Sequence, residues 1–340
     1  MLDFSSDYNI GAADEIIEAL SKTNRERTAT YGEDIYSERA KEKIRKAAGC
    51  PDARVYFLVG GTQTNKTVIA SILNPFEGVV SAQTGHIATH ESGAVEYTGH
   101  KVLTLPEKDG KISSRDLESL FLAYLADETR EHTVKPGAVY LSHPTEYGTL
   151  YTKDELKEIS DISHRYGARL FIDGARLGYG LAAETDVTLA DIAAYSDVFY
   201  IGGTKVGALF GEAVVITNPD ICPCFFTSIK QHGALLAKGR MLGIQFDTLF
   251  TDDLYMRLGK RAIDSAMLLK RELLSRSYEL FIDSPTNQQF VILDKERLSL
   301  IRERVKCNLW CETSDGRYVI RLVTSFMTEE SEIHELLKIF

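Results

Sequence analysis

Three side chains that could do chemistry stand directly after predicted strands. Asp173 follows the apolar run Leu170-Phe171-Ile172, Lys205 comes one strand–helix step later after a Gly-Gly-Thr turn, and His86 follows another apolar run. The carboxyl ends of parallel strands meet at one edge of a sheet, and ligands bind there in doubly wound folds. We therefore expect a carboxylate, an amine and an imidazole to lie close together at that edge.

This set of groups suits pyridoxal 5'-phosphate (PLP). Its ring nitrogen is held by an acid, its aldehyde bonds to a lysine amine, and its phosphate binds well at a helix N-terminus. The stretch Gly60-Gly61-Thr62-Gln63, between a predicted strand and a predicted helix, would supply amides and a hydroxyl to that phosphate. Asp173 alone could simply cap a helix. The interpretation therefore depends on Lys205 lying near it.

A nucleotide-binding loop is the rival interpretation of the same stretch. Residues 60–67 read G-x-x-x-x-N-K-T, one residue away from the G-x-x-x-x-G-K-[ST] pattern that wraps phosphates. Asn65 stands where glycine would let the backbone approach the ligand. The sequence therefore favours PLP over a nucleotide hydrolase, in which Lys66 would contact the phosphates.

The elements that must position these groups alternate along the chain. Strands are predicted at 55–59, 78–82, 101–105, 138–142, 169–172, 197–201 and 213–216, with helices at 13–21, 35–48, 65–73, 86–96, 113–126 and 152–166. Strands that alternate with helices predict βαβ units, and hence an α/β fold with a doubly wound, mostly parallel sheet.

A second, smaller unit is predicted at the C-terminal end. The segment 238–274 is helical in pattern with few breakers, and beyond it the pattern predicts strands at 279–282, 289–293 and 318–323 and helices at 296–305 and 329–339. We predict a large cofactor-binding domain over 1–250, including the N-terminal arm, and a small α+β domain over 251–340.

Composition and charge limit the classes of partner. A net charge of −10 and a pI near 5.4 argue against nucleic acid or an anionic membrane surface. No segment has the length and apolar character of a membrane helix, and the first residues do not resemble a secretory signal. Five cysteines at these spacings indicate neither a disulfide scaffold nor a zinc site. We expect a cytoplasmic protein without a bound metal.

The motifs extend over nearly the whole chain and resemble one family. LDFSSDY, GGTQTN, TGHIATHESGAVE, FIDGARLGYG and YIGGTKVGALFGEAVVI are similar to stretches of the PLP-dependent β-eliminating lyases, in their threonine aldolase branch. The resemblance implies the aspartate-aminotransferase-type fold. It implies that Lys205 bonds to the cofactor, that Asp173 holds the proton on the ring nitrogen, and that His86 stacks on the ring face.

The resemblance also implies how the cofactor phosphate is bound and how subunits assemble. Gly61 and Thr62 would bind the phosphate, beside Gln63 of the same stretch. Tyr31 and Arg240 match stretches that approach the site from a neighbouring subunit, Tyr31 toward the substrate and Arg240 toward the cofactor. A homodimer or homotetramer with shared active sites is therefore expected.

The resemblance further implies a small amino-acid substrate. Arg176 and Arg321, helped by Ser6, would grip its carboxylate, for which a planar guanidinium is well suited. Arg321 lies inside an apolar strand, where an unpaired charge is costly, so a partner or ligand is expected in any case.

The implied reaction is cleavage of threonine or allo-threonine to glycine and acetaldehyde. β-Elimination, amino transfer on another amino acid, and a related protein that only binds PLP remain alternatives. The base that takes the β-hydroxyl proton is His86, His90, Glu146 or an ordered water. Enzymes of this branch often carry a second histidine after the strand at 138–142, where Glu146 stands here, so the base and the substrate preference stay open.

Overall fold

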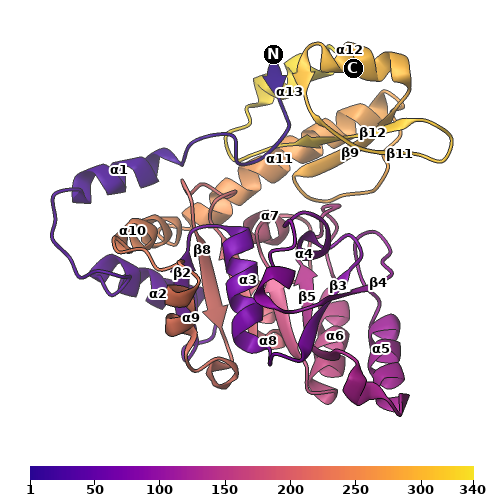
Figure 1. Cartoon of the computed structure of the whole chain (residues 1–340). Coiled ribbons are helices and arrows are strands. Elements are labelled where there is room, and N and C mark those ends of the chain that lie inside the picture. Colours follow the sequence, from indigo (N-terminus) through magenta and orange to yellow (C-terminus); the bar gives the residue numbers. More distant parts are fainter.

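Seven strands form one large sheet in the computed structural model, which describes all residues 1–340 (Figure 1). They run in the order β2-β8-β7-β6-β5-β3-β4. Their bounds are β2 Arg54–Leu58, β3 Glu77–Ala82, β4 Val102–Leu105, β5 Lys135–Ser142, β6 Arg169–Asp173, β7 Val198–Gly202 and β8 Glu212–Ile216. Strands β4, β3, β5, β6 and β7 are mutually parallel, and β8 is antiparallel to β2 and β7. The predicted α/β class is confirmed.

Both faces of this sheet are buried. On β6, Leu170 and Ile172 pack into one apolar cluster, and Phe171 between them packs into another on the opposite face. Side chains alternate along a strand, so a run without polar residues indicates cover on both sides. The covering helices include α2 Ile35–Ala47, α3 Gly61–Ile72, α5 Ser114–Ala126, α6 Lys153–Arg165, α7 Leu177–Ala182, α8 Leu189–Tyr195, α9 Phe225–Gln231 and α10 Arg240–Leu249.

The C-terminal part carries a separate antiparallel sheet (Figure 1). Its strands run in the order β11-β12-β9, and two short strands, β1 and β10, pair in parallel beside it. The bounds are β1 Leu2–Asp3, β9 Gln288–Leu293, β10 Val305–Lys306, β11 Asn308–Glu312 and β12 Tyr318–Val323, with helices α11 Leu254–Ser275, α12 Lys295–Arg302 and α13 Glu330–Leu337. The N-terminus therefore lies against the C-terminal part, and helix α1 Asp14–Thr23 follows it.

Helix α11 joins the two parts of the chain. Leu258 and Ala262 in its first half belong to the core of the large sheet, and Leu269 and Leu273 in its second half pack against the small sheet. The division of the chain near residue 250 stays a prediction. None of the helices combines the length and apolar character that a bilayer crossing requires.

Two predicted helices were too long. The segment 86–96 forms only one turn, α4 His86–Thr89, before an irregular stretch. The segment 238–274 is two helices, α10 and α11, with Asp252 and Asp253 between them at φ 51° and 56°. Acidic residues tolerate this left-handed conformation better than most, and hydrophobic periodicity alone does not reveal it.

Other differences concern short or irregular elements. Helix α3 begins at Gly61, four residues before its predicted start, so the Gly-rich stretch is its first turn. The strand predicted at 279–282 is reduced to one bridge, between Leu280 and Val291. Helices α7, α8 and α9 and strands β10 and β11 carried no clear periodic signal and were missed.

A buried histidine after β5 predicts acid sensitivity of the fold. His143 is fully buried, neither ring nitrogen has a hydrogen-bond partner, and burial lowers its pKa from 6.5 to about 4. The folded ring stays neutral while the unfolded ring takes up a proton below its ordinary pKa of 6.5. Stability therefore falls as the pH falls from 6.5 toward about 4. We expect the free energy of unfolding to drop by about 2 kcal/mol from this group between about pH 7 and about pH 5.

Denaturant titrations of the wild type and of His143→Gln at the two pH values check this. The glutamine variant should lose less stability on acidification, since it has no group to protonate there. Equal losses in both proteins would contradict the assignment.

Candidate active site

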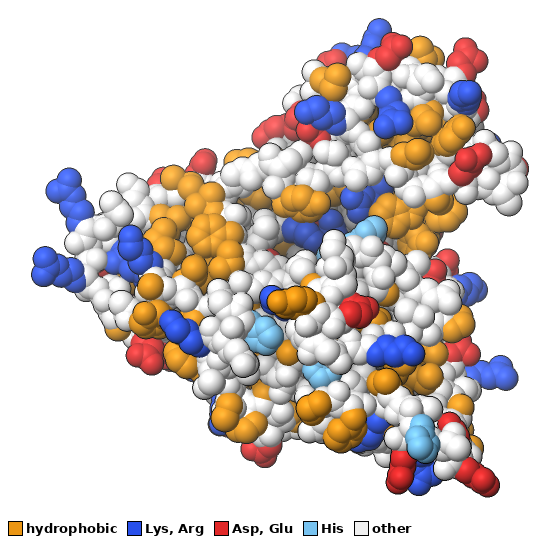
Figure 2. Space-filling view, viewed as in Figure 1, with side chains coloured by type: hydrophobic (Ala, Val, Ile, Leu, Met, Phe, Trp, Pro, Cys, Tyr) orange, Lys and Arg blue, Asp and Glu red, His pale blue; other side chains and the backbone are white.

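A cavity lies beyond the carboxyl ends of β5, β6 and β7, on the side that faces the C-terminal part. Its lining includes Gly61, His86, Asp173, Arg176 and Lys205. The space-filling view shows the surface hollowed between the two parts of the molecule, with basic and histidine side chains gathered there (Figure 2). The structure thus brings together the carboxylate, the amine and the imidazole that the sequence placed at strand ends.

Asp173 ends β6 and is only 4% exposed. Burial alone would raise the pKa of its carboxyl, but the charge of His86 and hydrogen bonds from Tyr140, Tyr200 and a backbone amide lower the pKa below its ordinary value. Tyr140 Oη donates to Asp173 Oδ2 at 2.6 Å, and the backbone N–H of Ala175 donates to Oδ1 at 2.9 Å. A carboxylate that accepts several such bonds stays ionised in a buried position.

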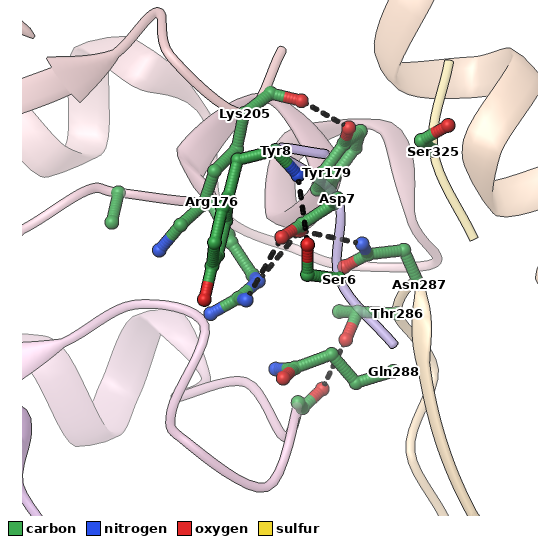
Figure 3. A network of polar contacts seen from close by, with 12 residues as sticks. Ser6, Asp7, Tyr8, Arg176, Tyr179, Lys205, Thr286, Asn287, Gln288 and Ser325 are labelled. Atoms are coloured by element: carbon green, nitrogen blue, oxygen red, sulfur yellow. Dashed lines mark hydrogen bonds and ion pairs between the residues drawn. The ribbon is translucent and has the colours of Figure 1, made fainter. Parts of the chain in front are cut away.

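Lys205 lies in the loop after β7. Its side chain is half-buried, and burial together with the nearby charge of Arg176 lowers the pKa of its amine to about 8. The amine lies 5.8 Å from the centre of the Tyr8 ring. The backbone carbonyl of Lys205 accepts a hydrogen bond from the Tyr179 hydroxyl (Figure 3). A lysine with a lowered pKa is more often in the neutral form that reacts as a nucleophile.

His86 begins α4 at the rim of the cavity. Its backbone N–H donates to Glu146 Oε1 at 2.8 Å, and Ser142 Oγ donates to the same oxygen at 2.6 Å. Burial raises the pKa of the Glu146 carboxyl. The His90 ring lies 5.7 Å from that of His86, and burial, with the charges of His86 and Arg321, lowers the pKa of His90.

The first turn of α3 points its free amides toward this region. Gly61 lines the cavity, and the first N–H groups of a helix have no partner within it. Thr62 is exposed, and Gln63 is turned back, because its Oε1 accepts a hydrogen bond from the Val59 N–H at 3.1 Å. This helix end could hold an anion.

Arg176 is already paired within the chain. Its Nε and Nη2 donate to the two carboxylate oxygens of Asp7 at 2.8 and 3.0 Å, and Asn287 Nδ2 donates to Asp7 Oδ2 at 2.9 Å (Figure 3). Asp7 is fully buried, and although burial raises its pKa, Arg176 and Lys205 bring the pKa below its ordinary value. Ser6 lies beside this pair. The N-terminal segment thus reaches into the site and ties the small sheet to the large one.

Arg321, on β12, is held differently. Its Nη1 donates to Gln288 Oε1 at 3.0 Å, its guanidinium carbon lies 5.2 Å from the centre of the Trp310 ring, and its Nε has no partner. No carboxylate forms an ion pair with it, and burial lowers its pKa to about 10. An unpaired, half-buried cation beside the cavity is suited to an anionic ligand.

Six predicted site residues do not line the cavity of their own chain: Ser6, Tyr31, Thr62, Gln63, Arg240 and Arg321. Two of them have their contacts elsewhere. Tyr31 lies 40% exposed in a different hollow, together with Phe226 and Leu235. Arg240, at the start of α10, donates to the backbone carbonyls of Glu26, at 2.7 Å, and Thr23.

Sequence reasoning missed several residues of the site. Asp7 is one of two acids in the quoted LDFSSDY stretch and directly follows Ser6, and Trp310 is the only tryptophan of the chain, so both offered a signal. Asn287 lies in the irregular segment before β9, and no spacing indicated its contact with Asp7. Glu91 directly follows His90 in the sequence, and only the folded chain brings its carboxylate to His86 Nδ1.

Comparison with known proteins gives the family. The profile of the family described as Beta-eliminating lyase matches residues 3–306. The low specificity L-threonine aldolase of a Pseudomonas species (strain NCIMB 10558) is 30% identical over 98% of this chain and 95% of its own length. The corresponding protein of Pseudomonas aeruginosa is 31% identical over 88% of this chain and 87% of its own. The chain belongs to the β-eliminating lyase family.

Solved structures agree with this membership. A Leishmania major threonine aldolase is 41% identical to the chain with a TM-score of 0.96, and the match covers 100% of this chain and 98% of that one. A Thermus thermophilus aspartate aminotransferase is 16% identical to the chain with a TM-score of 0.70, and the match covers 100% of this chain and 95% of that one. At that identity the second likeness shows the fold, which confirms the expected aspartate-aminotransferase type.

The unequal pairing of the two arginines predicts unequal effects on stability. Arg176→Gln leaves the Asp7 carboxylate buried without its partner and should lower the free energy of unfolding by about 3 kcal/mol. Arg321→Gln removes a cation that has no carboxylate partner and should cost less than about 1 kcal/mol. Urea denaturation of both variants and the wild type near neutral pH measures the difference. A larger loss for Arg321→Gln would reverse the assignment.

Proposed function

We propose that this chain is a PLP-dependent lyase that cleaves a β-hydroxy-α-amino acid, threonine or allo-threonine, to glycine and acetaldehyde. The observation that carries the proposal is that Asp173, Lys205 and His86 line one cavity, each at the carboxyl end of a strand of the large sheet. The threonine aldolases of Pseudomonas and Leishmania, which resemble the chain over nearly its whole length, support this choice of reaction within the family.

The residues present fit PLP. Asp173 is an ionised, buried carboxylate of the kind that would hold a proton on the ring nitrogen, and Lys205 has an amine with a lowered pKa for the aldehyde. The free amides of Gly61, Thr62 and Gln63 open α3, where a phosphate would bind. When bound, PLP supplies an electron sink conjugated to the α-carbon of an amino acid.

The chain's own groups would bind and orient the substrate. Arg321 is assigned the main contact with the substrate carboxylate, because it has no acidic partner and a donor to spare. Arg176 has two donors committed to Asp7, so it would contribute its remaining Nη1. Ser6, next to Asp7 in the chain, would add a hydroxyl. Held in this way, the substrate would keep a fixed orientation in the cavity.

A histidine is the best suited base for the β-hydroxyl proton. His90 has a lowered pKa, so it is neutral near pH 7 and can accept a proton, and His86 lies beside it. Glu146 is less suited, since its Oε1 already accepts two hydrogen bonds beneath His86. An ordered water held by these groups could relay the proton.

We also propose that the protein forms a homodimer or homotetramer with shared active sites. Each subunit would consist of two domains, residues 1–250 and 251–340. Tyr31 and Arg240 do not line the cavity of their own chain, and Tyr31 is exposed next to the apolar side chain of Phe226. Placed against a second copy, this surface would bring Tyr31 toward the neighbour's substrate and Arg240 toward its cofactor.

The purified protein loaded with PLP should form glycine and acetaldehyde from L-threonine or L-allo-threonine. Lys205→Ala should lower kcat at least about a thousandfold, because the amine that anchors the cofactor is lost. Glycine is quantified by chromatography and acetaldehyde by a coupled dehydrogenase, with pyruvate formation from serine and cysteine measured in parallel. Pyruvate without glycine would indicate an eliminating lyase. If neither glycine nor pyruvate forms, the result would favour a protein that only binds PLP.

Arg321→Lys tests the assigned carboxylate contact. It keeps the charge but loses the planar fork, so KM for threonine should rise at least about tenfold while kcat changes less than about threefold. Arg302→Lys, at an exposed position of the same C-terminal part, serves as the control and should leave both constants unchanged. An unaltered KM in Arg321→Lys would remove Arg321 from the substrate site.

A further inference from the structure

One carboxamide lies between two buried carboxylates beside the cavity. Asn65 Nδ2 donates to Glu91 Oε1 at 2.7 Å and to Asp173 Oδ2 at 2.9 Å. The amide nitrogen carries two protons, so it can serve both acceptors at once. Asn65 is fully buried and Glu91 is 5% exposed, so no water competes freely for these contacts. Asn65, which stands where the nucleotide-loop pattern has glycine, thus makes contacts that glycine could not make.

Glu91 connects this amide to the ring of His86. Its Oε1 also lies 2.7 Å from His86 Nδ1. A carboxylate can only accept hydrogen bonds, so a contact this short requires the proton of the neutral imidazole to sit on Nδ1. Nε2 is then the nitrogen with the free lone pair. The tautomer of a histidine is commonly fixed by what its other nitrogen contacts.

We propose that Glu91 and Asn65 are positioning residues: Glu91 fixes the Nδ1–H tautomer and the orientation of His86, and Asn65 holds Glu91 and Asp173 in place together. The inference rests on the proposed function for its catalytic meaning, since a stacked His86 with a free Nε2 could accept a proton at the cavity. The contacts themselves are independent of any substrate. They form one path, His86–Glu91–Asn65–Asp173.

A role in packing alone does not account for these residue types. Asn65 Oδ1 and Glu91 Oε2 have no hydrogen-bond partner in the protein. Leaving buried polar atoms unpaired costs about 1–3 kcal/mol each, and apolar residues of similar volume would avoid that cost. The shared amide and the carboxylate therefore serve the groups they contact, at the expense of stability.

The tautomer of His86 in the unaltered full-length protein is the first test. Ring ¹⁵N and ¹³C NMR of histidine-labelled protein, with His86 assigned by its loss in His86→Gln, reports which nitrogen carries the proton of the neutral ring. We expect Nδ1–H in at least about tenfold excess over Nε2–H. A majority of Nε2–H would overturn the proposal, and the His86→Gln variant serves only to assign the resonance.

Two variants and a matched control extend the test. Glu91→Gln should reduce the excess of Nδ1–H at least about fivefold, because the anionic acceptor is gone. Asn65→Leu should weaken PLP binding, followed by absorbance titration of the cofactor-free protein, at least about tenfold, because Asp173 loses a donor. Thr64→Val, one residue away on α3, removes a buried hydroxyl that has no partner and should change neither quantity.

The outcomes separate this inference from the proposed reaction. If the tautomer and the PLP affinity shift as expected but threonine is not cleaved, the positioning role stands and the reaction assignment fails. If threonine is cleaved while Glu91→Gln leaves the tautomer ratio unchanged, or Asn65→Leu binds PLP no more weakly than Thr64→Val, the positioning role fails and the reaction stands. In the active protein, Glu91→Gln should lower kcat at least about tenfold with KM within about threefold.

Discussion

The site depends on keeping one carboxylate ionised inside the protein. Asp173 is almost fully buried, and an isolated buried charge would take up a proton. The fold supplies donors from three directions: Tyr140 on β5, Tyr200 on β7 and Asn65 on α3. Because β5 and β7 lie on either side of β6, the sheet places both tyrosines against it. The strand order and the charge state of this carboxylate are therefore linked.

Two cations near Asp173, Lys205 and Arg176, are offset by a second buried carboxylate. Lys205 and Arg176 lie close enough for the arginine to lower the pKa of the amine, and the anion that offsets them, Asp7, comes from near the N-terminus, 169 residues before Arg176. Its segment is fixed on the small sheet, where the Val323 N–H of β12 donates to the Phe4 carbonyl at 2.9 Å. The position of the C-terminal part and the electrostatics of the lysine are thus coupled through a few N-terminal residues.

The sequence predicted the parts of this structure that depend on local pattern. Buried strands such as Leu170–Ile172 have an unbroken apolar signature, and the rule that ligands lie at strand ends was enough to bring Asp173, Lys205 and His86 together. What it could not predict depends on contacts distant in sequence. The pairing of Asp7 with Arg176 joins residues 169 positions apart, and the exposure of Tyr31 and the pairing of Arg240 depend on tertiary packing. Breaks such as that before α11 follow from single residues with positive φ, which periodicity does not reveal.

Helix α3 explains why a loop so close to a nucleotide-binding pattern suits a different ligand. Residues four apart lie on the same face of a helix, so Gly61 in its first turn and Asn65 one turn later both line the cavity. Free amides at the first position suit a phosphate, and the carboxamide at the second contacts the carboxylate assigned to the ring nitrogen. One turn of helix would thus contact both ends of a small flat cofactor. A glycine at position 65 would free the backbone for a second phosphate but would leave Asp173 and Glu91 without their shared donor.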